Sequence, residues 1–426
     1  MFSPPWRPVF LFAMLAFGPA LPAVDAILRI DRTVEAGTSQ LRLGLTHTHA
    51  GLDAQGAHET AVKRATELLR GVAAFQNTHI MGWGVDSPMP KADSYRWASL
   101  DARLNFMSTL GGEPVITLCT CPGWMKRSGK DWAMDEAPAA EHFDAFAALC
   151  VEVARRYPQV RHYQVWNEFK GFWSKEQNNW DAETYTALYN KVYDALKRHD
   201  PRLNVGGFYL VVQGTGSKKP GTNTYEPWSE KSREVLKYWL KNKHGADFVC
   251  VDRGMQDFHD KNRYTFDELM ALTPLFGKVV REIHELTDLP VWWAEYYGAG
   301  TETPETAAAQ YASIYIHMVR SGASVALLWN PVDGEAGCGL VTPVRDPTGG
   351  AALPHLTVYR AINEHFSRGA VLVKAESSLP AVEVLATKTK TLLVNKSAVK
   401  VPIDLNGAKT ELAPYEVRLM DTPGKL

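Results

Sequence analysis

The feature of this 426-residue sequence that most constrains its fold is an alternation of short β-rich runs with amphipathic helical stretches. The β-rich runs predict eight strands, at Leu41–His47, Thr78–Val85, Pro114–Cys119, Val160–Trp166, Asn204–Val211, Asp247–Asp252, Pro290–Ala294 and Ser324–Trp329. Between them lie helical stretches, among them Ala57–Gly71, Ala139–Tyr157, Asp181–His199, Phe266–Leu286 and Glu305–Ser321. A strand–helix unit of roughly 30–45 residues that recurs eight times is typical of an α/β fold, the (β/α)₈ TIM barrel.

A doubly wound open sheet is the alternative architecture, because it also alternates strands with helices. Such a sheet usually carries a glycine-rich phosphate-binding turn after its first strand. The first strand predicted here ends in Thr46-His47-Thr48-His49, and no turn of that type follows it. The sequence therefore favours a closed barrel, which we expect to span 40–369.

The composition changes after Gly369. Short β-branched runs follow, separated by turn residues such as Asn406-Gly407. These runs are Val371–Lys374, Ala381–Thr387, Thr391–Asn395, Val401–Leu405 and Glu416–Met420. Ile27–Val34, before the first barrel strand, is expected to add another strand. The segments 27–39 and 370–426 thus predict a small accessory antiparallel β-domain, similar to a β-sandwich, beside the barrel.

Residues 1–26 have the features of a secretory signal peptide. Arg7 precedes an apolar run, and small residues follow that run. We expect cleavage after Ala23 or Ala26. Gly18 and Pro19 interrupt the run, which makes it short for a membrane span, although an uncleaved anchor is the alternative. We therefore expect a secreted or periplasmic protein with no stable membrane span after signal cleavage.

The cysteines and the charge balance exclude several classes of protein. Five cysteines are too few for a dense disulfide framework, and the sequence favours free thiols over one disulfide from Cys338 to Cys119 or Cys121. No further Cys or His stands at metal-ligand spacing, so we expect neither metal nor cofactor. The 46 basic and 47 acidic residues leave a net charge of -1 without a basic run, which argues against a nucleic-acid partner.

Two glutamates occupy the positions from which a barrel of this type presents reactive groups. The fourth predicted strand runs into Asn167-Glu168, and the seventh ends at Glu295. Reactive side chains in TIM barrels come from the C-terminal ends of the strands, so both carboxylates are expected at the same rim. Two carboxylates over one cleft are the minimal equipment for cleaving a glycosidic bond. A single Glu at such a position would more often cap a helix or pair with an Arg.

With Asn-Glu ending strand four and Glu ending strand seven, the sequence resembles clan A retaining glycoside hydrolases, and within them glycoside hydrolase family 39. The resemblance covers approximately residues 40–369 and implies that Glu168 is the acid/base and Glu295 the nucleophile. It also implies that Asn167 bonds the 2-hydroxyl of the sugar.

The sequence departs from the clan pattern at three places. The second predicted strand contains no Arg near the nucleophile, and Phe169 stands where xylosidases of the family usually have Pro. Strand six lacks the usual His or Tyr that orients the nucleophile, and Arg253 or His259 is a candidate for that role. These departures weaken a xylosidase assignment in particular.

Further candidates for sugar contact lie at or just past strand ends. Thirteen tryptophans are many for this length, and four of them could stack on a sugar ring or pack under a loop: Trp83, Trp124, Trp173 and Trp329. His47 and His49 alternate so as to share one face and are expected to contact sugar, a structural role being the alternative.

The predicted function is hydrolysis of β-glycosidic bonds in a polysaccharide or oligosaccharide, by double displacement with retention of configuration. A catalytically silent carbohydrate-binding barrel and a transglycosylase that uses the same residues are the alternatives.

Overall fold

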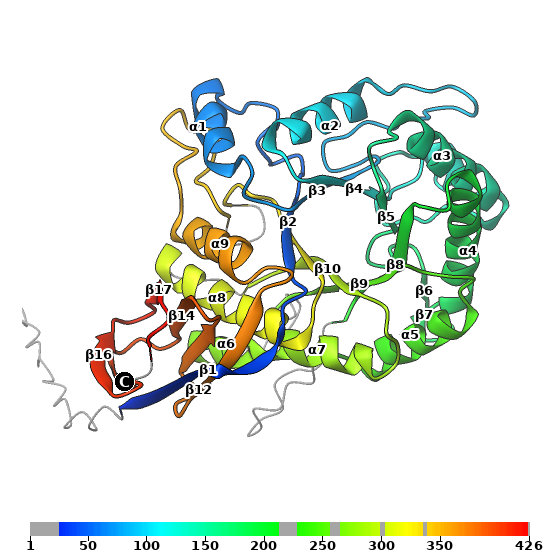
Figure 1. The fold of residues 1–426 in the computed structure, drawn as a ribbon. Coiled ribbons are helices and arrows are strands. Elements are labelled where there is room, and N and C mark those ends of the chain that lie inside the picture. Colours follow the sequence, from blue (N-terminus) through cyan, green and yellow to red (C-terminus); the bar gives the residue numbers. More distant parts are fainter. Residues whose placement is uncertain (1–24, 213–227, 256–264, 299–302, 335–338, 425–426) are drawn as a thin grey trace, which may run out of the picture.

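The computed structural model describes residues 25–212, 228–255, 265–298, 303–334 and 339–424. Eight parallel strands close into a barrel in the order β10-β11-β2-β3-β4-β5-β8-β9 (Figure 1). They are β2 (Arg42–Thr46), β3 (Phe75–His79), β4 (Glu113–Leu118), β5 (His162–Val165), β8 (Asn204–Val211), β9 (Phe248–Arg253), β10 (Val291–Tyr296) and β11 (Val325–Trp329). The predicted (β/α)₈ TIM barrel is confirmed. Of the predicted signal peptide, 1–24 lie outside the described residues.

Helices surround the barrel, as Figure 1 shows. They are α1 (Glu59–Leu69), α2 (Ala98–Leu110), α3 (Phe143–Arg156), α4 (Ala182–His199), α5 (Glu230–Asn242), α6 (Phe266–Leu272), α7 (Pro274–His284), α8 (Pro304–Ser321) and α9 (Pro354–His365). Local sequence explains their ends. In α8, for example, Thr303 forms a capping box, Pro304 occupies the first turn and Gly322 ends the helix at φ 82°.

Two predicted elements have different bounds in the structure. The second barrel strand is β3 at Phe75–His79, not Thr78–Val85, because the chain turns tightly between Gly82 and Val85, with Trp83 at φ 45°. The predicted helix Phe266–Leu286 is two helices, α6 and α7. Pro274, which has no amide hydrogen to continue a helix, begins the second of them.

The barrel interior is filled by side chains in layers. Near the N-terminal ends of the strands, the Phe248 and Trp292 rings stack with centroids 3.9 Å apart. Above them a buried polar chain crosses four strands: Asn77 donates to Thr46 (3.0 Å), Thr117 donates to Asn77 (3.1 Å) and Gln164 donates to Thr117 (2.9 Å). Because the interior is packed, a substrate has to bind at the C-terminal mouth.

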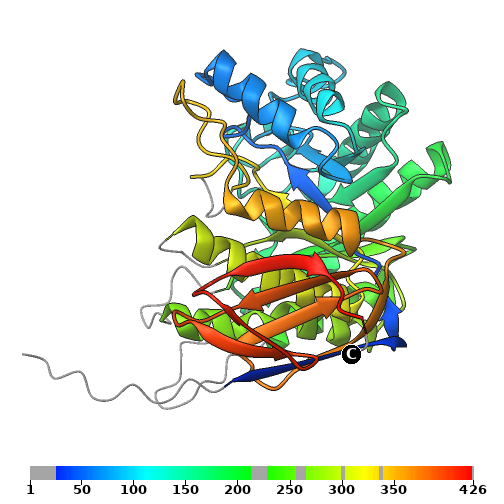
Figure 2. The ribbon, with the colours of Figure 1, turned by 60° about the vertical axis from the view of Figure 1, so that its left-hand side comes forward.

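The accessory β-domain consists of two sheets, of which the one formed by β13, β14 and β17 packs against α8 (Figure 2). The first sheet has the order β12-β1-β15-β16 and consists of β12 (Val371–Ser377), β1 (Ala26–Thr38), β15 (Val401–Leu405) and β16 (Ala408–Leu412). The second sheet has the order β13-β14-β17 and consists of β13 (Val382–Ala386), β14 (Lys390–Asn395) and β17 (Val417–Asp421). Asn406 (φ 49°) and Gly407 (φ 95°) form the turn from β15 into β16, a strand that the sequence did not indicate. All pairs are antiparallel except β1 with β15.

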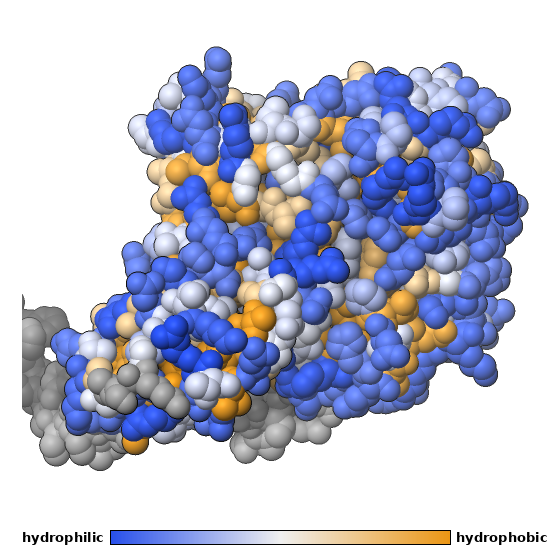
Figure 3. Space-filling view, in the orientation of Figure 1, coloured by the Kyte–Doolittle hydropathy of each residue, from blue (hydrophilic) through white to orange (hydrophobic). Residues whose placement is uncertain are grey.

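Within the described ranges, no helix is both long enough and apolar enough to cross a bilayer. The face seen in Figure 3 is largely hydrophilic, and its hydrophobic residues lie in separate places rather than in one continuous patch.

Candidate active site

Glu168 lies in a tight turn directly after β5, between Trp166 and Lys170. Three non-glycine residues of the turn have left-handed backbone conformations, Trp166 at φ 70°, Glu168 at 49° and Phe169 at 52°. The buried Trp166 indole donates to the Lys170 carbonyl (2.8 Å), and the Lys170 amide donates to the Asn167 carbonyl (3.1 Å). Such a fixed, strained turn is typical of a functional site and presents the Asn167-Glu168 pair at the barrel mouth.

Glu295 and Asp252 face each other from the neighbouring strands β10 and β9. The pairing of the two strands shifts by one residue between Trp293 and Glu295, which makes Asp252 the register partner of Glu295. A bulge of this kind bends a strand and re-aims a side chain. Both carboxyls are buried, with Asp252 2% and Glu295 4% exposed.

Tyr209 reaches the same site from β8 because of a second irregularity. The register of β8 against β9 shifts between Gly207 and Leu210, and Phe208 within the shift has φ 71°. The ring of Phe208 contacts Trp239 of α5, outside the barrel. Tyr209 therefore points inward, and its hydroxyl donates a hydrogen bond of 2.8 Å to Oε2 of Glu295.

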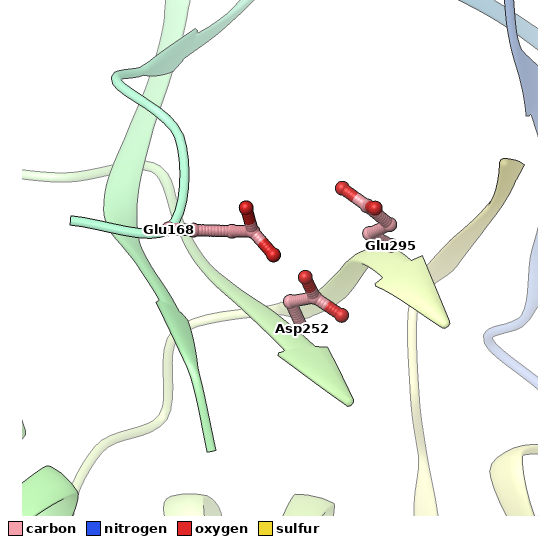
Figure 4. Close-up of side chains that lie close together, drawn as sticks. All are labelled: Glu168, Asp252 and Glu295. Carbon is pink, nitrogen blue, oxygen red and sulfur yellow. The ribbon is translucent and has the colours of Figure 1, made fainter. Parts of the chain in front are cut away.

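The carboxyls of Glu168, Asp252 and Glu295 form one cluster, shown in Figure 4, with Asp252 between the two glutamates. One oxygen from each lies within 4.8 Å of the others. The Lys170 ammonium forms an ion pair with Glu168 and brings one positive charge to the cluster. Glu168 is partly exposed at the open side, while the other two acids lie deeper.

Burial and charge determine how the deeper groups ionise. Burial raises the pKa of the Asp252 carboxyl well above its usual range, and the Glu295 charge raises it further, whereas Lys170 acts in the opposite direction. Burial, followed by the charges of Glu295 and Asp252, raises the pKa of the Tyr209 phenol. Both groups are thus favoured in their protonated forms, which can donate hydrogen bonds to an ionised Glu295.

Asn167 is buried beside Glu168 at 1% exposure. Neither atom of its amide has a hydrogen-bond partner within the part of the chain that the structure describes. Buried polar atoms without partners are uncommon and costly, and a bound ligand is one group that can satisfy them.

An aromatic group lies at the ends of β3 and β11. The His79 ring is 4.0 Å from Trp83 and 5.7 Å from Trp329, and the two indoles are 5.9 Å apart. Burial, then the charges of Lys170 and Arg103, lower the pKa of His79. Trp329 ends β11 and Trp83 lies just past the end of β3, so both belong to the C-terminal rim of the barrel, where the acidic cluster also lies.

The other predicted contact residues lie elsewhere. His47 is buried, bonded to Gln76 (2.7 Å) and in edge contact with Phe106 of α2, so it faces the helix layer; burial lowers its pKa to about 4. His49 is exposed in the loop after β2. Trp124, in the 3₁₀ helix η1 (Gly123–Met125), donates to the Met89 carbonyl (3.0 Å).

Trp173 lies in a small hairpin beyond the Glu168 turn, formed by β6 (Trp173–Ser174) and β7 (Asn179–Trp180). It is 48% exposed. Its ring contacts Trp180 edge-on at 5.3 Å. The structure therefore leaves Trp173 exposed in this hairpin, not in the acidic cluster.

Three site residues were not predicted from the sequence: Tyr209, Asp252 and Lys170. Tyr209, not a residue of strand six, makes the contact that orients Glu295. Of the two candidates for that role, the Arg253 guanidinium lies over the Phe276 ring of α7 at 5.9 Å, and His259 is outside the described residues. Asp252 could have been found, because it ends a predicted strand.

The sequence predicted no metal ligands, whereas the structure brings three acids close together. The three acids form the one group of His, Cys, Asp or Glu close enough to share an ion in the described ranges, and three carboxylates are also what a hard cation binds. Here Lys170 already supplies the positive charge. Cys119, Cys121, Cys150 and Cys250 are buried and free, and Cys338 falls outside the described residues.

Comparisons with solved structures support the fold. A monomeric beta-xylosidase from Caulobacter crescentus aligns with TM-score 0.60 and 19% identity over 89% of this chain and 83% of the other. A conserved exported protein from Bacteroides fragilis aligns with TM-score 0.65 and 11% identity over 92% and 99%. The catalytic domain of a GH30 xylanase from Talaromyces cellulolyticus aligns with TM-score 0.56 and 14% identity over 94% and 98%.

No family model and no curated protein matches the sequence. At these low identities the solved structures establish a shared architecture, namely a (β/α)₈ barrel with an accessory β-domain. The chemistry has to be argued from the site.

Proposed function

We propose that this protein is a retaining glycoside hydrolase that cleaves β-glycosidic bonds of a polysaccharide or oligosaccharide. The observation that carries the proposal is the approach of Glu168 and Glu295, whose oxygens lie within 4.8 Å across the barrel mouth. Carboxyls about 5–5.5 Å apart serve double displacement, whereas inversion needs about 6.5–9.5 Å to admit a water. The names of two structural neighbours, a beta-xylosidase and a xylanase, agree with a β-linked substrate.

In the first step, Glu168 gives its proton to the glycosidic oxygen as the C1–O bond breaks, and a Glu295 oxygen bonds to C1. In the second step, water attacks C1 and gives a proton to Glu168, and Glu295 leaves as a carboxylate. Glu295 is assigned as nucleophile over Asp252 because Tyr209 donates to it and because burial favours the protonated form of Asp252. Asn167, with its amide free, is positioned to bond a sugar hydroxyl.

The aromatic group provides a surface for the sugar ring. Trp83 is partly exposed, and the Trp329 ring packs against it edge-on, with the ring centroids 5.9 Å apart. An indole face packs against the C–H face of a sugar, which adds affinity without fixing which sugar is bound. We infer from these residues a carbohydrate substrate, and from 1–26 a secreted or periplasmic protein. Cleavage after Ala23 would leave β1, which begins at the buried Ala26, intact.

The test is hydrolysis of a panel of aryl β-glycosides and β-linked polysaccharides by the wild type, Glu295→Ala and Glu168→Gln. Each variant should lose about 10³-fold or more in turnover without unfolding. Glu364→Gln, on the exposed face of α9, is the matched control and should retain wild-type turnover. Azide should rescue Glu295→Ala by forming a glycosyl azide of inverted configuration.

Two results would count against the proposal in different ways. Near-normal hydrolysis by either active-site variant would remove the mechanism. Tight sugar binding by the wild type without release of product would favour a silent carbohydrate-binding barrel. Product analysis at high acceptor concentration separates hydrolysis from transglycosylation, which uses the same residues.

A further inference from the structure

Asp252 has no role in the two-carboxylate reaction, yet it lies between the two glutamates that carry out that reaction (Figure 4). It is the register partner of Glu295, so the main chain of two adjacent barrel strands fixes its position. Its alternation with Phe248 and Cys250, which belong to the cluster inside the barrel, directs its side chain to the interior.

The protonation state of Asp252 follows from its surroundings. In the proposed reaction Glu168 holds a proton and Glu295 is ionised before the first step. Asp252 is 2% exposed, lies within 4.8 Å of Glu295 and forms no ion pair within the described ranges, since Lys170 pairs with Glu168. An ionised Asp252 would place a second buried negative charge beside Glu295, which is strongly unfavourable, so Asp252 is the further group that has to remain neutral.

We propose that Asp252 is a third functional carboxyl, a positioning residue that keeps its proton throughout the reaction and directs it as a hydrogen bond to Glu295. Tyr209 donates to Oε2 of Glu295 from β8. Asp252 supplies a second donor from β9, and the two together hold the nucleophile's carboxylate against rotation. The inference rests on the proposed function, because it assigns Glu295 as the nucleophile.

The described surroundings of Asp252 support this assignment. Within the described ranges, the titratable and charged groups that face it are Glu295 from β10, Tyr209 from β8, and Glu168 and Lys170 from the turn after β5. Burial and Glu295 favour its protonated form, and Lys170 alone among the charged side chains opposes them. Ionisation of Asp252 at alkaline pH would place a second negative charge beside Glu295 and remove the donor at the same time.

The experiment compares Asp252→Asn with Asp252→Leu. Asparagine is neutral and still donates, whereas leucine has similar bulk and no donor. We expect turnover of an aryl β-glycoside by Asp252→Asn to exceed that of Asp252→Leu by about tenfold or more. The decline of wild-type activity on the alkaline side should move to higher pH in Asp252→Asn. Asp247→Asn, just before β9 and paired with Lys197 outside the site, is the control and should keep the wild-type pH profile.

A second measurement does not depend on activity. The infrared difference spectrum between Glu168→Gln and the double variant Glu168→Gln/Asp252→Asn at neutral pH should contain the carbonyl band of a protonated carboxylic acid, because neither variant carries the Glu168 proton that would give the same band. Absence of the band from this difference spectrum would overturn the proposal even if Asp252→Leu failed to fold. Equal losses of turnover in Asp252→Asn and Asp252→Leu would also overturn the proposal, because they would mean that Asp252 acts as an anion. An unchanged pH profile in Asp252→Asn would overturn it as well. If instead Glu295→Ala and Glu168→Gln stay active, the proposed function itself fails.

Discussion

The Tyr209 hydroxyl donates a 2.8 Å hydrogen bond to Glu295 across the β8 and β10 strands, which do not neighbour each other in the barrel. β9 lies between them and contributes Asp252. Glu295 is therefore bonded from β8 and lies beside Asp252 of β9, and this geometry depends on irregular pairing on both sides of β9.

Tyr209→Phe should lower turnover by about 10- to 100-fold while the fold is kept. The ring would remain in the apolar layer inside the barrel, and the donor to Glu295 would be lost. Steady-state kinetics on an aryl glycoside and a thermal melt measure the two effects. Tyr296→Phe is the control, because its hydroxyl bonds Tyr315 in the helix layer at 3.0 Å. Equal kinetic losses in both variants would contradict the assignment.

The fold and the two glutamates could be predicted because both depend on regular patterns. Strand–helix alternation identified the barrel, and the position of reactive groups at C-terminal strand ends identified Glu168, Asn167 and Glu295. The same rule applied to β9 would have added Asp252.

The remaining site residues depend on irregularities that no residue pattern indicates. Tyr209 faces inward because the pairing of β8 shifts at Phe208, and an unbroken strand would have directed Phe208 there instead. Lys170 reaches Glu168 through a turn of left-handed non-glycine residues. His47 faces the helix layer because Thr46, one residue earlier, points into the barrel and bonds Asn77, so the alternation of β2 directs His47 outward toward α2.

Asn167→Ala should reduce turnover by about 100-fold yet change the free energy of unfolding by less than about 1 kcal/mol, because its amide has no partner to lose. Asn77→Ala is the matched control in the same barrel. It removes bonds to Thr46 and Thr117 and should cost roughly 1–3 kcal/mol of stability. Urea unfolding and kinetics separate the two variants. A large stability loss in Asn167→Ala would show that its amide is a structural group.

Trp83→Ala should weaken substrate binding, raising KM by about tenfold with a smaller change in kcat, if its ring carries a sugar. Trp124→Phe provides the comparison. It loses the bond to the Met89 carbonyl and should lower the melting temperature without changing KM. A KM that Trp83→Ala leaves unchanged would mean that its contact with His79 is packing alone.

Glu383 should connect the accessory domain to the barrel in a pH-dependent way. Its carboxylate on β13 pairs with Lys396 at 2.7 Å and His317 of α8 at 2.9 Å, and accepts from Ser313 at 2.7 Å. Although burial alone would raise the pKa of Glu383, these partners lower it from 4.5 to about 2. Because the folded-state value is depressed, the native state is stabilised above the unfolded value, and this contribution disappears as the pH falls from about 4.5 to about 2.

Glu383→Gln should accordingly cost roughly 3 kcal/mol at pH 7, and the difference from wild type should shrink steadily below pH 4.5. Denaturant unfolding at several pH values measures it. Glu376→Gln, which removes an exposed pair with Lys374, is the control and should change stability by less than about 1 kcal/mol at any pH. A Glu383→Gln deficit that stayed constant down to pH 3 would contradict the coupling, since a lost packing contact would not titrate.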